Sequence, residues 1–405
     1  MSAGDVNIAA ARRYSQGATM NEADLLRQFP VTAACTYLNH AAIAPWPQRT
    51  QEAVARFAAE NAQTGPRQLP RWVANEKSLR RQLAQLINAP SAEDIAFAKN
   101  TSEALSFVAG GFPWQSGDNL VVPYEEFPSN RIVWESLSER GVGVRAVRLQ
   151  DCADPEAALL AAMDARTRLL SVSTVQYATG LRLDLERLGG ECRRRGVAFC
   201  VDAIQGLGVL AHDVQATRID FLMADAHKWL LGPEGIAVFY CAADWRERIR
   251  LSEYGWHMVE DSDNYDHREW RVARGARRFE CGSLNRLGIE GLAASLSLLL
   301  EVGLPAIEQR VLERAQYLLR AIKARPRFEL LTPSERARHG GIVTFRTDPV
   351  SPLVLWKYLA EHNVVCAVRG GGIRLSPHFY VPMEQLDEAV RRLDQFGNPK
   401  RTMRI

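Results

Sequence analysis

Short runs of β-branched and apolar residues recur along the middle of the chain, and most are separated by segments with a helical pattern. Segment 185–196, LERLGGECRRRG, is typical of the intervening pattern, because its leucines and a cysteine recur at helical spacing beside a run of arginines. Such alternation favours an open, mostly parallel α/β sheet flanked by helices, in which ligands bind at the carboxyl ends of the strands. The expected strands are residues 119–124, 144–149, 168–175, 197–202, 220–225 and 236–241.

The pattern changes after residue 285. A long apolar helical segment, 288–303, is followed by GGIVTFRTD, a second helical segment and NVVCAVRGGGIRLSPHFYV. A chain of 405 residues, 47% of them hydrophobic, is long enough to form two cores. We therefore expect a large α/β domain over residues 30–285 and a smaller α+β domain formed by residues 1–29 and 286–405.

The composition and the charge balance bear on which kinds of molecule this protein binds. Lysine and arginine number 50 against 47 acidic residues, and a net charge of +3 predicts no electrostatic preference for nucleic acid or membrane. The N-terminus lacks the apolar run of a signal peptide, and no stretch has 18 consecutive apolar residues, so we expect a cytoplasmic protein. The seven cysteines form no CxxC pair and no metal-like spacing, which predicts reduced, mostly buried thiols and no metal site.

Charged side chains stand at two strand ends within the apolar segment 201–240. Asp202 ends one expected strand, Gln205 follows after a half turn, and His227 and Lys228 follow the next strand. Burying such groups is costly unless each meets a partner or a cofactor. A desolvated lysine amine forms Schiff bases, and a carboxylate can keep the nitrogen of a pyridine ring protonated.

A helix start lies earlier in the chain, in NTSEALSFVAGG. Asn100 is placed to cap this helix, and Glu103, three residues later, is placed to reach back in a capping box. The free amides of the helix start, with the hydroxyls of Thr101 and Ser102, are suited to a phosphate group. The alternative is an ordinary capped helix without a ligand.

These residues together resemble the pyridoxal-phosphate (PLP) enzymes of fold type I, specifically the class V aminotransferases, which include cysteine desulfurases, isopenicillin N epimerase and kynureninase. The resemblance runs from about Tyr37 to Phe396, and its most specific part is V-D-A-x-Q followed by H-K-W-L, with Lys228 standing 26 residues after Asp202. It implies a mostly parallel mixed sheet with a smaller α+β domain, PLP as cofactor, and an α-amino acid substrate bound as an external aldimine. It also implies a homodimer with shared active sites.

The resemblance also implies roles for individual residues. Lys228 matches the Schiff-base lysine that later moves a proton, and Asp202 matches the partner of the pyridine nitrogen. Further implied cofactor contacts are Phe127 on the ring, Gln205 and either Gln176 or Tyr177 on the phenolic oxygen, Thr101, Ser102 and His227 on the phosphate, and Ser283 on the phosphate of the neighbouring subunit.

The substrate carboxylate is assigned by the same resemblance to Arg374, because a guanidinium fork suits it. Weaker substrate-pocket candidates are Asn39, His40, Arg67, Trp256 and Arg369. Three of these residues have a structural alternative to the implied role. His227 could be a core histidine, Ser283 a turn residue and Arg374 a member of a surface ion pair.

Three departures from the relatives bear on the reaction. Phe127 stands where desulfurases have a histidine, so it can stack on a ring but cannot carry a proton. Asp225 stands where relatives have a phosphate-contacting serine; because a carboxylate repels a phosphate dianion, we expect it to point elsewhere or to bond through His227. The loop that carries the desulfurase cysteine is reduced here to Gly370–Gly372, and Cys366 lies before it in an apolar strand, which disfavours a persulfide.

The sequence thus predicts a PLP-dependent enzyme that acts on an amino acid with aminotransferase or carbon–sulfur lyase chemistry. Cysteine desulfurase and amino-acid epimerase are alternatives within the family. A non-catalytic PLP-fold binding protein is a remote alternative.

Overall fold

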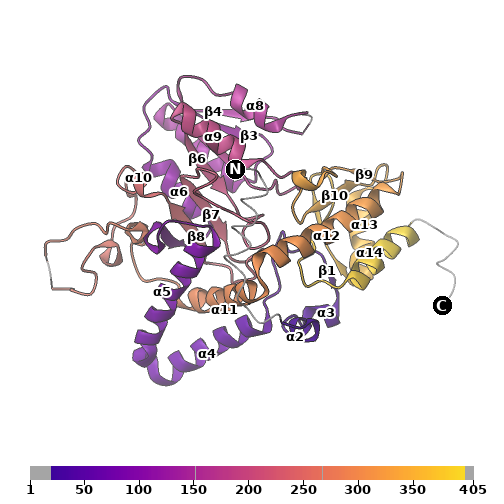
Figure 1. Cartoon of the computed structure of the whole chain (residues 1–405), viewed down its shortest axis with the longest axis horizontal. Helices are drawn as coiled ribbons and strands as arrows, with labels where there is room; N and C mark the ends of the chain where they lie inside the picture. The colour runs from indigo at the N-terminus through magenta and orange to yellow at the C-terminus, as the bar shows by residue number, and fades with distance from the viewer. Residues whose placement is uncertain (1–19, 151, 267, 397–405) are drawn as a thin grey trace.

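The computed structural model of the chain describes residues 20–150, 152–266 and 268–396 (Figure 1). Its largest sheet has seven strands in the order β2-β8-β7-β6-β5-β3-β4. The neighbours from β4 to β7 pair in parallel, whereas β8 runs antiparallel to both β7 and β2. The strands are β2 (Ile95–Ala98), β3 (Asn119–Pro123), β4 (Gly143–Val147), β5 (Thr167–Ser173), β6 (Ala198–Asp202), β7 (Phe221–Asp225) and β8 (Ala237–Cys241).

The six strands expected from the sequence are confirmed, and the mostly parallel mixed sheet is confirmed with them. Strand β2 was not expected, because its four residues, IAFA, are too few to show a period. Successive residues of a strand point to opposite faces, so Phe221 and Met223 join one hydrophobic core while Leu222 and Ala224 join the other. Both faces of the sheet are therefore apolar and must be covered.

Helices cover the two faces. On one face lie α6 (Thr101–Gly111), α7 (Ser129–Glu135) and α10 (Ala243–Arg246), and on the other lie α5 (Leu69–Leu86), α8 (Pro155–Ala161), α9 (Leu185–Arg195) and α11 (Arg286–Val302). Helix α9 is the amphipathic helix expected from LERLGGECRRRG, with Leu188 and Cys192 buried. Helix α4 (Gln48–Thr64) packs on α11 and forms, with α5, the hairpin at the bottom of Figure 1.

A four-stranded sheet in the C-terminal part of the chain has the order β12-β13-β10-β9 and lies to the right in Figure 1. Its strands are β9 (Glu329–Leu330), β10 (Val343–Arg346), β12 (Ala367–Arg369) and β13 (Gly372–Leu375), with α12 (Leu304–Lys323), α13 (Pro352–Glu361) and α14 (Met383–Gln395) around them. The short strand β1 (Thr36–Tyr37) pairs in parallel with β11 (Val364–Val365), which ties the N-terminal segment to this part.

The division into domains at residues 30–285 stays a prediction, and residues 1–19 and 397–405 of the expected small domain lie outside the described residues. The remaining elements are short. They are α2 (Glu22–Arg27), α3 (Val31–Ala34), η1 (Gly65–Gln68), η2 (Ala92–Asp94), η3 (Ser136–Arg140), η4 (Trp256–Met258), η5 (Ala276–Phe279) and η6 (Arg336–Arg338).

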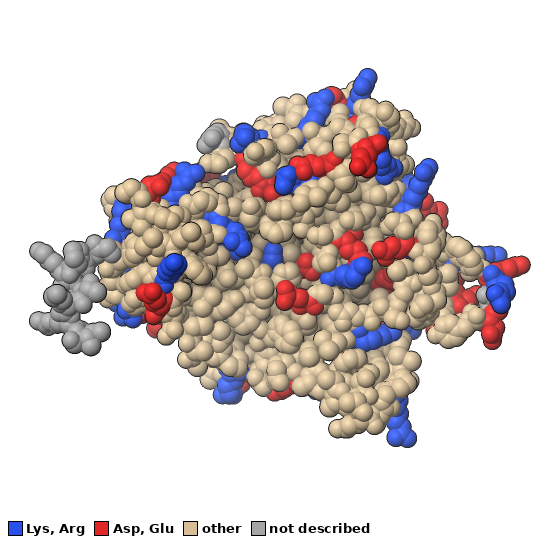
Figure 2. Space-filling view, turned by 180° about the vertical axis from the view of Figure 1, so that it is seen from behind, with Lys and Arg blue, Asp and Glu red and all other residues tan. Residues whose placement is uncertain are grey.

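The surface carries both signs of charge. On the face shown in Figure 2, basic and acidic side chains are interspersed without a single-sign field, in keeping with the small net charge. Within the described ranges, no single helix is long and apolar enough to cross a bilayer; α11 and α12 reach that length and composition only as a pair bent by 84°. All seven cysteines are free, and four of them are buried.

Candidate active site

Four neighbouring strands, β7, β6, β5 and β3, run in the same direction and end at one edge of the large sheet. Lys228, Gln205, Tyr177 and Phe127 follow these four ends in that order. Contacts link three of them, since Lys228 Nζ lies 5.5 Å from the centroid of the Phe127 ring, and that ring lies edge-to-face with Tyr177 at 5.1 Å. Gln205 bonds to the indole of Trp229, the neighbour of Lys228 in the chain. The candidate residues expected at the strand ends thus form one site.

Lys228 and Asp202 are two buried ionisable residues of this site, with relative exposures of 8% and 2%. Burial lowers the pKa of the Lys228 amine to about 8, although the Asp202 carboxylate opposes that shift. Burial likewise raises the pKa of Asp202 to about 6, against a hydrogen bond of 3.0 Å that Asp202 accepts from the Ile204 amide. The Lys228 amine has no hydrogen-bond or ion-pair partner in the described part of the chain, so a substantial neutral fraction is free to act as a nucleophile.

The start of α6 is built as the sequence suggested, with one difference. The Asn100 side chain accepts the Glu103 amide at 2.9 Å and caps the helix, but the Glu103 carboxylate reaches back to the Lys99 amide at 2.5 Å rather than to that of Asn100. Ser102 donates its hydroxyl to Ser129 at the start of α7, at 2.8 Å. Two helix starts and two hydroxyls thus lie side by side, which suits an anion.

Asp225 does not point away from this helix start, contrary to our expectation. One carboxylate oxygen accepts the amide and the hydroxyl of Thr101 at 3.0 and 3.2 Å, and the Asp225 amide in turn donates to that hydroxyl. The other oxygen is buried without a partner and lies 3.9 Å from His227 Nδ1, which is also buried without a partner. The expected bond between Asp225 and His227 is therefore not formed at this distance.

Two amide side chains proposed for the phenolic oxygen of the cofactor are held by protein groups. Gln205 donates to the Ala41 carbonyl at 3.0 Å and accepts from the Trp229 indole at 2.9 Å. The Gln176 amide oxygen accepts the amides of Ala178 and Thr179, and its nitrogen donates to the Glu125 carbonyl. The hydroxyl of Tyr177, by contrast, bonds to none of the described residues. Of the two alternatives, Tyr177 is the freer to meet a ligand.

Arg374 is a buried cation that has no counter-ion among the described residues. It lies on β13 with a relative exposure of 2%, donates to the Tyr177 carbonyl at 2.7 Å, and leaves its Nε without a partner. Burial, aided by the nearby charge of Arg369, lowers its pKa to about 10, so the guanidinium stays charged at neutral pH. The surface ion pair that was the ordinary alternative is not what the described residues form, and the free donors are available to an anion.

The weaker substrate candidates divide into two groups. His40 is fully buried, and both ring nitrogens are occupied, by the Ser376 carbonyl at 2.9 Å and the Tyr380 hydroxyl at 2.6 Å. As a direct substrate contact it is therefore not supported, because it has no free polar atom. Asn39 keeps its side-chain oxygen buried without a partner, and Arg369 is exposed beside Arg374. Arg67 is exposed at the junction of α4 and α5.

Residues 36–391 match the family model of aminotransferase class V. The chain belongs to this family. A probable cysteine desulfurase of Methanothermobacter thermautotrophicus is 30% identical over 93% of this chain and 98% of its own, and the isopenicillin N epimerase of Streptomyces clavuligerus is 30% identical over 88% and 94%. The solved structure of a cystine C–S lyase, C-DES, in complex with its product cysteine persulfide superposes with a TM-score of 0.85, at 25% identity over 92% of this chain and 100% of that one.

Membership of the family makes this chain a PLP-dependent enzyme of transferase or lyase type. The residues present fit that cofactor. Lys228 offers a free amine, Asp202 a buried carboxylate one strand away, and Phe127 an exposed ring face near the amine. His227 Nδ1 and Arg374 Nε are buried polar atoms that the described protein groups leave unsatisfied, as expected where a ligand completes the hydrogen bonding.

Glu126 is a residue that sequence analysis missed. It is buried beside Asp202, and its carboxylate accepts the amide and the hydroxyl of Ser173 at 2.6 and 2.5 Å. Burial, and then the charge of Asp202, raises its pKa to about 7, although the Ser173 hydroxyl opposes the shift. The available signal was the acidic pair Glu125–Glu126 shortly after the apolar strand that ends at Pro123.

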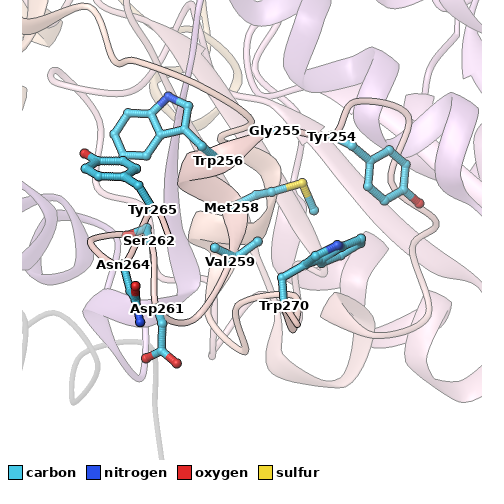
Figure 3. A pocket seen from close by; sticks show the side chains of 10 residues that line it. All are labelled: Tyr254, Gly255, Trp256, Met258, Val259, Asp261, Ser262, Asn264, Tyr265 and Trp270. Atoms are coloured by element: carbon cyan, nitrogen blue, oxygen red, sulfur yellow. The ribbon is translucent and has the colours of Figure 1, made fainter. Parts of the chain in front are cut away.

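Ser283 is exposed and lines a separate cavity of about 260 Å³. Glu103, in the first turn of α6, lines the same cavity. Trp256 lies elsewhere again, in an aromatic pocket of about 410 Å³ (Figure 3). In that pocket Trp256 stands beside Tyr265, Trp270 stands on the opposite side near Tyr254, and Met258 lies between them. Among the described residues, neither lysine nor arginine lines this pocket.

Proposed function

We propose that this chain is a PLP-dependent carbon–sulfur lyase that cleaves a small cysteine-type amino acid, such as cystine, without a protein-bound persulfide. The observation that carries the proposal is the glycine turn beside Arg374. Gly370 and Gly371, both with positive φ, close a two-residue hairpin in which Arg369 of β12 pairs with Gly372 of β13. A turn of this length cannot extend a cysteine toward the substrate.

The cysteine that lies nearest to that turn in the sequence is Cys366, between β11 and β12. Its relative exposure is 5%, and burial raises its pKa to about 12, so it holds almost no thiolate at neutral pH. The thiolate is the nucleophile in sulfur transfer between a substrate and a cysteine. A desulfurase that stores sulfur on Cys366 is therefore disfavoured, and direct release of sulfur is favoured.

The roles of the other residues follow from their surroundings. PLP, when bound, withdraws electrons from the α-carbon of an amino acid and so weakens its C–H bond. Lys228 would carry the cofactor and then take the α-proton with its amine, while Asp202 holds a proton at the pyridine nitrogen. Arg374 would orient the α-carboxylate. A sulfur leaving group then departs from the β-carbon, and for cystine and water the products are cysteine persulfide, pyruvate and ammonia.

Further cofactor contacts are proposed from the same geometry. Phe127 would stack on the ring, Tyr177 would meet the phenolic oxygen, and Ser102 and His227 would contact the phosphate. Thr101, expected from the sequence to do the same, has its amide and hydroxyl bonded to Asp225 and would hold that carboxylate beside the phosphate. Gln205, with both ends of its amide already bonded, would act chiefly by holding Trp229 next to Lys228.

We also propose a homodimer with shared active sites, in which Ser283 completes the phosphate site of the partner. Its exposure supports this proposal, as do the exposed aromatic rings of the Figure 3 pocket, because surface aromatics gathered in one place mark interaction sites. The η4 turn of that pocket packs on η5, and the His257 amide donates to the Cys281 carbonyl two residues before Ser283. A cytoplasmic location, expected from the sequence, stays a prediction.

The test is an assay of the purified, PLP-loaded protein with cystine, cysteine and a panel of other amino acids, with all products identified. Pyruvate, ammonia and a persulfide product from cystine would support the lyase. Alanine, formed with a sulfur adduct on the protein, would indicate a desulfurase. A 2-keto acid that retains the substrate side chain would indicate an aminotransferase, and the D-enantiomer an epimerase.

A further inference from the structure

Asp225 poses a problem for the proposed cofactor site, on which this inference rests. It lies at the start of α6, where an anion would be held, and its carboxylate already occupies the amide and hydroxyl of Thr101. A phosphate dianion that approaches this helix start meets a second negative charge in a buried environment, where repulsion is poorly screened. The site therefore needs a positive charge between the two anions.

We propose that Asp225 and His227 take up one proton from solvent when the cofactor phosphate binds, so that the imidazolium of His227 bridges the carboxylate and the phosphate. The new proton forms an N–H bond at Nδ1 and is shared with the free oxygen of Asp225. The opposite nitrogen, Nε2, then donates its own hydrogen to the phosphate. One carboxylate and one dianion are thus joined by a cation.

The geometry of the pair supports this role. Asp225 Oδ1 and His227 Nδ1 face one another at 3.9 Å, and both are buried atoms without another hydrogen-bond partner among the described residues. In the tautomer that keeps its hydrogen on Nε2 for the phosphate, Nδ1 and the Asp225 oxygen are both acceptors and cannot bond to each other until a proton enters the gap. A small rotation of either side chain then closes it to hydrogen-bond distance.

The charges around Asp225 and His227 determine the protonation of the two side chains before phosphate binds. Burial, with the nearby Lys228 charge, lowers the pKa of His227 to about 4, so the ring is neutral at neutral pH. Burial also raises the pKa of Asp225, and Glu234 adds to that rise while Lys228 opposes it. Asp202, on the neighbouring strand, feels the Asp225 charge as well. Thr101, from α6, contributes only neutral hydrogen bonds.

Linkage gives the sign of the expected pH effect. A proton taken up on binding makes binding weaker as the pH rises, by about tenfold in Kd per pH unit for one full proton. The effect should be largest between pH 7 and 8, where the free phosphate, with a second pKa of about 6, is already a dianion. A ligand without phosphate should show no such dependence.

The experiment is isothermal titration calorimetry of the cofactor-free full-length chain with pyridoxamine 5′-phosphate, which does not condense with Lys228. Titrations at pH 7.5 in Tris and in HEPES, whose ionisation enthalpies differ, give the number of protons taken up. We expect about one for the wild type and for the control Glu234→Gln, which removes a nearby exposed acid, and less than half for Asp225→Asn. Because the Asp225 charge also raises the pKa of the Lys228 amine, the same three titrations are repeated in a Lys228→Ala background, which removes the contribution of that amine.

Three further measurements separate the possible failures. Asp225→Ser, which removes the carboxylate and keeps a hydroxyl, should bind the phosphate ligand at least as tightly as the wild type with little pH dependence, and pyridoxamine should show no proton uptake. Phosphorus NMR of the wild-type complex should show a dianion. Binding without proton uptake, or uptake unchanged in Asp225→Asn, would overturn the inference alone; failure of both PLP and pyridoxamine 5′-phosphate to bind would overturn the proposed cofactor site with it.

Discussion

Two buried arginines of this molecule have opposite surroundings. Arg80, on α5, donates to Glu76, to both oxygens of Glu280 and to the Ile95 carbonyl, and these carboxylates raise its pKa further above its usual value. Arg374, on β13, donates to a single carbonyl, keeps one nitrogen unsatisfied, and has its pKa lowered by burial. The first cation is neutralised by its own chain, and the second is not.

The difference separates structural from functional burial of charge. Desolvation of an ion costs several kcal/mol, and only good pairing offsets that cost. Around Arg80 the protein supplies the pairing itself, and Arg286 joins the same network through Glu76. Around Lys228 and Arg374 the described residues do not complete the charge pairing and hydrogen bonding of the two cations. This indicates that a ligand supplies the missing partners. The comparison predicts that substitutions in the two regions have opposite effects on stability and activity.

The largest effect is expected for Lys228→Ala. The variant should lose turnover by roughly 10⁴-fold, because a positioned proton carrier contributes about 10²–10⁴ and the covalent anchor is lost with it. The visible absorbance of the bound cofactor should disappear, while the midpoint of urea unfolding of the cofactor-free protein should not fall, because the amine has no hydrogen-bond or ion-pair partner among the described residues. Lys77→Ala, on the exposed face of α5, is the control and should change neither property. A cofactor adduct that borohydride still reduces onto the variant would mean that another lysine is the anchor.

The paired region should respond in the opposite way. Glu280→Gln leaves Arg80 buried without its main counter-charge and should destabilise the fold by about 3–5 kcal/mol, measured by urea unfolding. Cofactor absorbance per folded molecule should be unchanged. The matched control is Glu301→Gln, which breaks the half-exposed pair with Arg49 and should cost about 1 kcal/mol or less. Equal losses in the two variants would contradict the distinction between the regions.

Arg374→Met gives the third effect. Methionine retains an apolar stem but no charge, so affinity for α-carboxylate substrates should fall about 10- to 100-fold, from the loss of about 1.5–3 kcal/mol of charge-assisted hydrogen bonding. Stability should be equal to or greater than that of the wild type, because an unpaired buried cation is removed. Titration of the cofactor spectrum with substrate measures the first quantity and urea unfolding the second. Unchanged affinity would point to the exposed Arg369 as the carboxylate partner.

The sequence predicted the elements better than the contacts between them. Six strands could be located because their apolar runs are bounded by helical patterns, and Lys228 and Asp202 stood out because charge is rare in such runs. The bond between Asp225 and Thr101 joins residues 124 positions apart and depends on β2, which was not expected. His40 is buried and bonds to the Tyr380 hydroxyl, and Gln205 accepts a hydrogen bond from the Trp229 indole. Both contacts depend on tertiary packing, which no local sequence pattern predicts.

The smallest effect is expected for substitution of Cys366. This residue also distinguishes a lyase from a desulfurase, because a desulfurase would need its thiol as a nucleophile. Its thiol is buried in an apolar surrounding, with the Trp356 indole bonded to its carbonyl, and burial keeps its pKa near 12. Such a thiol is a small apolar side chain in practice. Cys366→Ala should therefore keep the main activity within a few fold of the wild type. Sulfur from a cysteine-type substrate should leave directly from the β-carbon after Lys228 takes the α-proton.

Mass spectrometry after incubation with cystine checks this expectation. Cys152, which is less buried than Cys366, is the control position, because nonspecific oxidation by persulfide products should mark the more accessible thiol first. Since direct elimination leaves nothing on the protein, Cys366 should carry no additional sulfur atom while substrate is being turned over. A sulfur adduct confined to Cys366, together with loss of turnover in Cys366→Ala, would mean that the segment between β11 and β12 opens during catalysis. The enzyme would then be a desulfurase in spite of its short glycine turn.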